Sequence, residues 1–294
     1  LAPRLNAAGR LDDMSLGIAC LLERDEGRAR QLALRLDELN RERRAIESEM
    51  KRQAIAQVER LGDLDARASE PGELPWGICV FDEDWHPGVV GIVAARVREK
   101  YHRPVIAFAP DGDAGLKGSG RSVPDLHLRD TLDSVAAGSS GLLTRFGGHA
   151  MAAGLSLRKR DLAAFTSAFD AAVRARLGEE HLQGVIHSDG ELDGMDLGLE
   201  TAEAIRAGGP WGQGFPEPVF DGRFQVLSHR VVGEAHLKLL LRSPDGDAVD
   251  AIAFNRAGLA EGGLPDHLHL AYRLDVNEFR GQRSPQLIVE HVTQ

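Results

Sequence analysis

Residues 76–110 read WGICVFDEDWHPGVVGIVAARVREKYHRPVIAFAP and hold two short apolar runs with a helical pattern between them. The runs WGICVF and RPVIAFAP are typical of buried strands, and VVGIVAARVREKY spaces its apolar residues as an amphipathic helix does. A strand, a helix and a strand within about 35 residues form a βαβ unit, whose two strands are parallel. This stretch therefore predicts an α/β domain.

The residues after this unit extend the domain. GLKGSGRS (115–122) predicts a glycine-rich edge strand or loop, and GLSLRK (154–159) predicts a strand. Helical patterns cover residues 126–135 and 161–177. Together these elements predict a mixed α/β domain.

The residues before the unit predict one long helix. Apolar residues recur at steps of three, four and seven from Gly27 to Leu61, which at 1.5 Å per residue is a helix about 50 Å long. Such a helix suits a strut between domains. A coiled coil is the alternative, although Arg43 interrupts its apolar seam. ARASEPGELP (66–75) reads as a linker.

From about residue 184 the pattern changes to strands. Five alternating or apolar runs, one helix near 197–207 and a hairpin turn at SPDGD (243–247) predict a small barrel of the OB type. The expected fold class is thus α/β plus all-β. The expected domains are the remnant of a further domain (1–15), a long connecting helix (16–65), the α/β domain (74–180) and an OB-like domain that binds nucleic acid (184–294).

Composition sets limits on function. The chain has 294 residues, 43% of them apolar and 27% charged, as in soluble globular proteins. No apolar run reaches the roughly 18 residues of a membrane span, and two scattered cysteines suit a reducing cytoplasm. The first residue is not Met, so we expect a piece of a longer protein. The net charge of −10 argues against a wholly basic face, yet residues 115–160 carry seven Lys/Arg against three Asp.

FGGHAMAAG (146–154) lies within that basic window. Its glycines allow close backbone approach, and if residues 150–153 begin a helix, their amides and His149 form an anion pocket. A tight turn that merely lets two elements pack closely is an equal alternative.

Other candidates for an anion site come from two neighbouring motifs. In GSGRSVPDLHLRDTL the guanidinium of Arg121 is suited to phosphate, with hydroxyls of Ser119 and Ser122 beside it. His86 precedes a helix in WHPGVVGIVAARV, although a lone His there is more often structural. No cluster of Asp and His has metal-ligand spacing, and the local group Asp82, Asp84 and His86 is a weak candidate.

The predicted barrel offers weaker candidates for binding single strands. Phe279 could stack on a base, and basic or polar side chains could follow the backbone. These are Lys238, Arg256, Arg273, Asn277 and Arg280.

Six stretches of the chain resemble, in the same order, the RecJ family of the DHH phosphoesterase superfamily. They are LAPRLNAAGR, WHPGVVGIVAARV, GSGRS, GGHAMAAG, WGQGFPEPVF and DAIAFN. The resemblance covers essentially the whole chain. It implies a 5′→3′ exonuclease specific for single-stranded DNA, acting in DNA repair and recombination, which releases 5′-mononucleotides by hydrolysis at two Mn²⁺ or Mg²⁺ ions. By this resemblance only the last piece of the catalytic DHH domain is present, and no DHH triplet occurs in the sequence. We therefore expect no metal on this chain's own residues. We also expect the fragment alone to be inactive.

The resemblance also assigns residues. Arg4 and Asn6 would line the rim of the metal centre, while Gly147, Gly148 and His149 would close over the substrate with Arg121 and Ser122. His149 would be a catalytic phosphate clamp rather than a metal ligand or nucleophile. Implied partners are single-stranded DNA, single-strand-binding protein and a RecQ-type helicase, for a cytoplasmic monomer. The alternatives are another DHH phosphodiesterase acting on short oligonucleotides, and a non-catalytic module that binds DNA or a partner.

Overall fold

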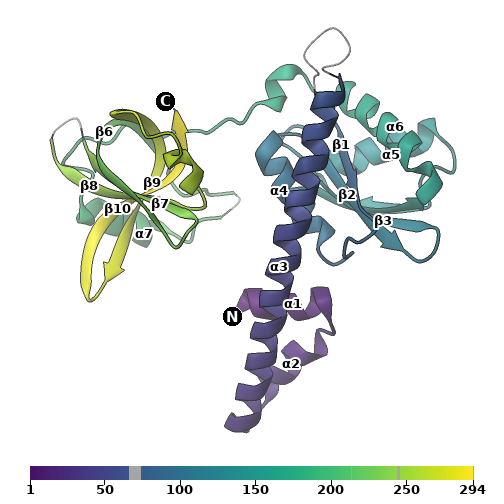
Figure 1. Cartoon of the computed structure of the whole chain (residues 1–294), viewed down its shortest axis with the longest axis horizontal. Helices are drawn as coiled ribbons and strands as arrows, with labels where there is room; N and C mark the ends of the chain where they lie inside the picture. Colours follow the sequence, from purple (N-terminus) through teal and green to yellow (C-terminus); the bar gives the residue numbers. More distant parts are fainter. Residues whose placement is uncertain (66–73, 213, 244–245, 294) are drawn as a thin grey trace. The chain divides into compact units, whose positions relative to one another are not determined.

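The structure, a computed structural model, describes residues 1–65, 74–212, 214–243 and 246–293. Most of the expected linker and part of the expected turn at 243–247 therefore lie outside the described residues. The chain forms two compact units, Leu1–Gly184 and Val185–Gln294 (Figure 1). None of the described helices has the length and apolar character needed to cross a membrane.

One five-stranded sheet is the centre of the first unit. Its strand order is β1-β2-β3-β5-β4, and β1 pairs in parallel with β2 while the other neighbours are antiparallel. The predicted βαβ unit is confirmed, because α4 connects β1 to β2. The elements are β1 (Ile78–Phe81), α4 (Val90–Tyr101), β2 (Val105–Asp111), β3 (Gly115–Arg121), β4 (Arg145–Gly148) and β5 (Ala152–Arg158).

The glycine-rich stretch at 115–122 is an inner strand, so its prediction as an edge strand or loop is wrong. Strand β3 lies between β2 and β5. Its glycines provide room for neighbouring side chains: a Cβ on Gly118 would lie 2.6 Å from the Phe108 ring, and one on Gly120 would lie 2.8 Å from Leu128. Glycine serves packing at these two positions.

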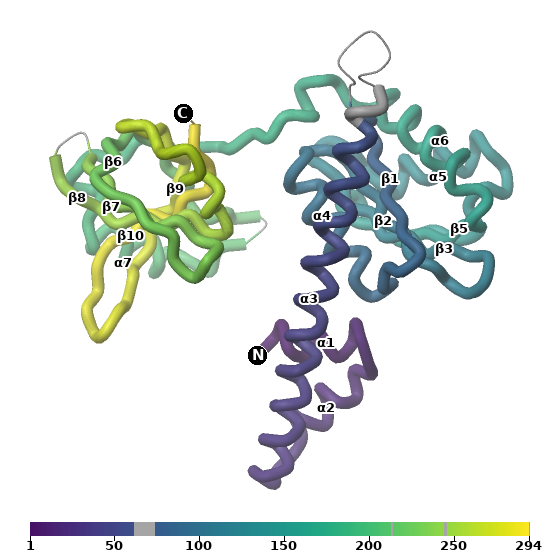
Figure 2. The backbone as a smooth tube through the Cα atoms, viewed as in Figure 1, coloured from purple at the N-terminus to yellow at the C-terminus, as the bar shows by residue number. Residues whose placement is uncertain are grey.

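Helices cover the two faces of the sheet unequally. Helices α5 (Leu128–Gly138) and α6 (Leu162–Arg174) pack on one face, over a core that includes Phe108, Leu155 and Phe165. On the other face α4 and α3 cover β1, β2 and the adjoining edge of β3 (Figure 2). The β5–β4 side of that second face carries exposed residues, and the candidate site lies there.

The long helix α3 (Glu26–Asp65) confirms the predicted helix. Its first half packs on α1 (Ala2–Leu11) through Leu36 and Leu39, and its second half packs on α4 through Met50 and Ala54. Residues 16–65 are nevertheless not one helix, because α2 (Ser15–Leu22) is separate. The Asp25 side chain accepts a hydrogen bond from Arg28 N at 2.8 Å, which caps a new helix start.

The second unit is a closed five-stranded barrel, as predicted. Its order is β10-β8-β7-β6-β9, with β10 parallel to β8, and α7 (Leu199–Gly208) packs against β9. Inward-facing Leu, Val and Tyr272 side chains fill its interior. The strands are β6 (Phe220–Val232), β7 (His236–Arg242), β8 (Ala248–Ala253), β9 (His267–Phe279) and β10 (Gln282–Thr293).

Candidate anion-binding site

The stretch FGGHAMAAG forms a hairpin between β4 and β5. His149 N donates to Ala152 O at 2.8 Å across the turn, and residues 152–158 continue as a strand. The helix start proposed for residues 150–153 is therefore wrong, and with it the pocket of helix amides. The turn is anchored by hydrogen bonds from Ser122 N to Met151 O and from Leu128 N to Ala150 O.

The two glycines of β4 have different roles. Gly148 has φ +146°, and a Cβ there would lie 2.4 Å from Ala152 O, so the hairpin requires glycine at this position. Gly147 has no such need, because a Cβ there would meet nothing within 4 Å. Gly147 thus leaves open space above an exposed stretch of backbone.

Small and basic residues lie in rows on the second face of the sheet, from Ser119, which lies beside Gly91 of α4, to the exposed strand β4. In the strand register Ser119, Gly154 and Gly147 are cross-strand neighbours. The next row holds Lys117, Ser156 and Arg145. We call these six residues the bare face. A surface with little side-chain bulk and two exposed cations suits the close approach of a phosphate backbone.

Arg121 lies at one end of the bare face and is half-buried. Its Nη1 donates to Gly120 O at 2.8 Å and to Ser119 Oγ at 3.2 Å. A Cβ on Gly91 of α4 would lie 3.0 Å from Arg121 Nη2, so this glycine leaves room for the guanidinium. The ion pairs of the described residues do not include Arg121.

Two more arginines, Arg10 and Arg98, lie near the Arg121 guanidinium. Arg10 Nη1 donates to Gly88 O at 3.1 Å, and Arg98 Nη1 donates to Ser122 O at 3.4 Å. Arg98 Nε is buried with no hydrogen-bond partner in the described part of the chain. Burial lowers the pKa of Arg121, and repulsion by Arg10 and Arg98 lowers it further. Arg98 Nη2 lies 3.8 Å from Glu99 Oε1, whereas Arg10 and Arg121 have no carboxylate partner among the described residues. These two unpaired cations favour a bound anion.

Ser122 does not belong to this site. It is fully buried, and its hydroxyl donates to Leu126 O at 2.7 Å. The predicted phosphate contact of Ser122 is wrong, because its oxygen is used to hold the loop before α5. His86 has a local role as well, since its Nδ1 accepts from Gly88 N at 3.0 Å, beside the carbonyl that Arg10 contacts.

His149 lies at the same end of the sheet as Arg121. Arg121 pairs with Ala152 in the register, and His149 is in the turn that precedes Ala152. Its side chain is exposed. Arg4 and Asn6 lie on α1, where Arg4 Nε is bonded to Asp37 Oδ1 at 2.6 Å and Asn6 is exposed. The roles assigned to these residues stay predictions.

The barrel candidates divide into two groups. Lys238 pairs with Asp250, Arg256 donates to Glu290 O, and Arg273 pairs with Glu217 and Glu290. Phe279 and Arg280 are exposed at the β9–β10 turn, with the guanidinium carbon 5.2 Å from the ring centroid. Asn277 precedes them on β9. The residues at the β9–β10 turn are therefore more accessible to a ligand than Lys238, Arg256 and Arg273.

An exposed aromatic pair on the barrel was missed from sequence. Phe254 follows β8 and is 49% exposed, and its ring lies 5.2 Å from the His236 ring in an edge-to-face arrangement. Asn255 N donates to His236 Nδ1 at 2.9 Å, which fixes the pair. The sequence did indicate this ring, because side chains in DAIAFN (250–255) alternate between the inside and the outside of the barrel and Phe254 falls at an outward position.

Comparisons with known proteins agree with both units. The DHHA1 domain family matches residues 75–175, and the RecJ OB domain family matches residues 188–291. The chain is therefore of the class that joins a DHHA1 domain to an OB barrel.

Over its whole length the chain is similar to RecJ proteins. It is 49% identical over 99% of its length to the Single-stranded-DNA-specific exonuclease RecJ of Haemophilus influenzae and 48% identical to that of Escherichia coli, and it covers 50% of each. It thus spans about half the length of these curated relatives. A crystal structure of Thermus thermophilus RecJ in complex with Mn²⁺ matches the whole chain with a TM-score of 0.78 and 27% identity, over 40% of that structure. A second, with Mg²⁺, matches with a TM-score of 0.77 over 42% of its chain.

Proposed function

We propose that this chain is the substrate-holding part of a metal-dependent exonuclease specific for single-stranded DNA. The observation that carries the proposal is the group of Arg10, Arg98 and Arg121 beside the bare face. Arg10 and Arg121 have no carboxylate partner among the described residues. A phosphate bound there would neutralise their charge. The names of the relatives support single-stranded DNA as the polymer.

The chemistry that these residues supply is binding and orientation. Arg121 would fork onto one phosphate, Ser119 would donate a hydroxyl, and Gly147 would let the next phosphate approach the backbone. His149, at the same end, would place an imidazole against the phosphate under attack. Holding the reacting phosphate in a fixed position lowers the barrier to hydrolysis.

The relatives' structures contain Mn²⁺ or Mg²⁺, which in such enzymes activates water and stabilises the phosphate under attack. The donors around Arg121 are cationic or neutral and do not fit a divalent ion. These residues would therefore contact the phosphate itself and not a metal ion.

The barrel would hold the strand that enters the site. Exposed rings at Phe254 and Phe279 suit stacking on unpaired bases, which a duplex does not present. Attack from a 5′ end, release of 5′-mononucleotides and a role in DNA repair and recombination belong to this proposal. So do a cytoplasmic location and the partners single-strand-binding protein and a RecQ-type helicase.

The test is binding of fluorescein-labelled dT oligonucleotides to the 294-residue chain at several salt concentrations. We expect weak binding, a log K that falls with log salt, and tighter binding of single strands than of duplex. Phe254→Ala and Phe279→Ala should each weaken binding by about 1 kcal/mol or more through the lost stacking. Undetectable binding at low salt, or no preference for single strands, would contradict the proposal. Tight binding of dinucleotides alone would favour a phosphodiesterase of short oligonucleotides.

A further inference from the structure

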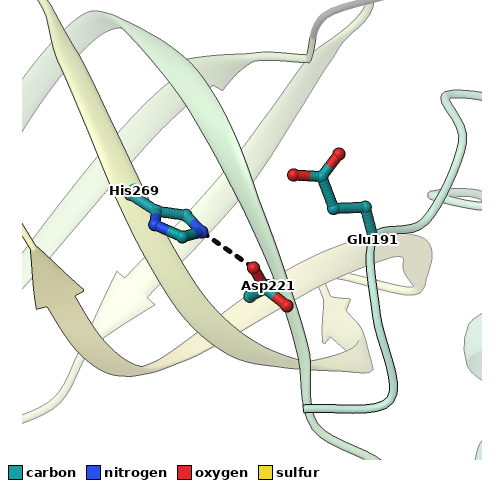
Figure 3. A group of neighbouring side chains, drawn as sticks. All are labelled: Glu191, Asp221 and His269. Atoms are coloured by element: carbon teal, nitrogen blue, oxygen red, sulfur yellow. Dashed lines mark hydrogen bonds and ion pairs between the residues drawn. The ribbon is translucent and has the colours of Figure 1, made fainter.

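We propose that the second unit binds one divalent transition-metal ion through Glu191, Asp221 and His269. These residues are far apart in sequence, yet each offers a donor atom and these atoms lie within 4.8 Å of one another. Figure 3 shows the His269 ring facing Asp221, with Nε2 2.8 Å from Oδ2, and Glu191 on the neighbouring segment. Residues 82–86, the local group considered from sequence, form no such cluster in the described part of the chain.

The donor set indicates the class of ion. One imidazole nitrogen and two carboxylates are the ligands that Zn²⁺ and its first-row neighbours accept in proteins, with water at a fourth position. Mg²⁺ and Ca²⁺ prefer oxygen donors alone. We therefore expect the affinity to follow Zn²⁺ over Mn²⁺ over Mg²⁺.

Paired backbone holds all three residues. Asp221 is on β6 and His269 on β9, which are hydrogen-bonded neighbours in the barrel. Glu191 belongs to a segment that runs beside β6: Asp221 N donates to Gly190 O at 3.1 Å, and Asp189 N donates to Val219 O at 2.7 Å. Ligands on such a support keep their mutual distances, as a metal site requires.

Side-chain contacts orient the ligands. Ser188 Oγ donates to Asp221 Oδ1, which leaves the other oxygen toward His269. Hydrogen bonds of this kind from outside the ligand set strengthen metal sites.

The local charge also favours a cation. Glu191 is exposed and has no ion pair among the described residues, although it lies near Asp221. Arg223 is the cross-strand neighbour of His269, but it pairs with neither carboxylate in the described structure. A divalent ion would neutralise the charges of Glu191 and Asp221 and would connect residues 188–191 to the barrel. This proposal is independent of the proposed nuclease function.

The test is titration of the EDTA-treated 294-residue chain with ZnCl₂ by calorimetry. We expect one tight equivalent per chain and a higher Tm of the barrel with Zn²⁺ than with EDTA. His269→Gln and Asp221→Asn should each weaken binding at least about tenfold, and Ser188→Ala about tenfold. His229→Gln is the matched control, because His229 is exposed on the strand that carries Asp221.

Several results would overturn the proposal. They are no binding of Zn²⁺ above that of the His269→Gln variant, equal loss in the His229→Gln control, or equal affinity for Mg²⁺ and Zn²⁺. Should His269→Gln fail to fold, Glu191→Gln replaces it, since Glu191 is exposed and forms no ion pair among the described residues. Unchanged Zn²⁺ affinity in Glu191→Gln would then refute the three-ligand site.

Discussion

Replacing Arg121 by Gln should weaken oligonucleotide binding without lowering the stability of the fold. The guanidinium is the half-buried member of a group of three arginines, and it has no ion pair among the described residues. A hydrogen bond to a charged group contributes about 1.5–3 kcal/mol. Since about 1.4 kcal/mol is a factor of ten in Kd, Arg121→Gln should weaken oligonucleotide binding roughly 10- to 100-fold.

The salt dependence provides a second measure of the same contact. Loss of one phosphate contact should reduce the slope of log K against log salt by about 0.7 for a single strand. Arg121→Lys keeps a charge but loses the planar fork, so it should weaken binding less and leave the slope nearly unchanged. Because Arg121 is desolvated and repelled by Arg10 and Arg98, its removal should not lower the Tm.

The assay is fluorescence anisotropy with a 5′-phosphorylated dT oligonucleotide, and the control is Arg160→Gln. Arg160 belongs to the same unit, its side chain is 74% exposed, and its loss changes the net charge equally. Equal Kd values for the Arg121→Gln and Arg160→Gln variants would refute a specific phosphate contact. A large fall in Tm for Arg121→Gln would show instead that the arginine supports the fold.

Three further predictions concern the rest of this unit. Gly148→Ala should destabilise the fold by about 1–3 kcal/mol in urea unfolding because of its positive φ and the 2.4 Å contact, whereas Gly147→Ala should leave unfolding unchanged and weaken DNA binding. A stable Gly148→Ala variant would contradict the hairpin described for β4 and β5. In a protein of the relatives' full length, His149→Ala should lower kcat about 100-fold with little change in KM, as loss of a transition-state donor does; an unchanged kcat would make His149 a turn residue. Cys79 is partly buried, and this burial raises the pKa of its thiol to about 12. Iodoacetamide should therefore label Cys79 more slowly in the native than in the urea-unfolded protein. Equal labelling rates would contradict that burial.

Much of the fold could be predicted because its signals are local. Strands β1 and β2 are continuous apolar runs, α4 has a clear helical period, and the barrel strands alternate inward and outward residues. The error at β3 has a physical cause: glycines at 118 and 120 resemble a loop, but they make room for Phe108 and Leu128. That reason depends on the neighbouring strand and helix and is not visible in the stretch itself.

The site was predictable only in part. Ser119, Arg121 and the glycine pair belong to short motifs, so their chemistry could be inferred from neighbouring residues. Arg10 and Arg98 are on helices and look like ordinary surface arginines until the fold brings them to Arg121. The bare face likewise depends on the strand register, which aligns Ser119 with Gly154 and Gly147. Asp221 and His269 come together because β6 pairs with β9, and Glu191 joins them because residues 189 and 190 bond to the backbone beside β6.

The most direct test of a phosphate site at Arg121 is a crystal structure of the chain with a short 5′-phosphorylated dT oligonucleotide. We predict a phosphate within hydrogen-bond distance of the Arg121 guanidinium and the strand running over Ser119 and Gly147. An oligonucleotide bound elsewhere, with its phosphates away from Arg121 and the bare face, would contradict the account.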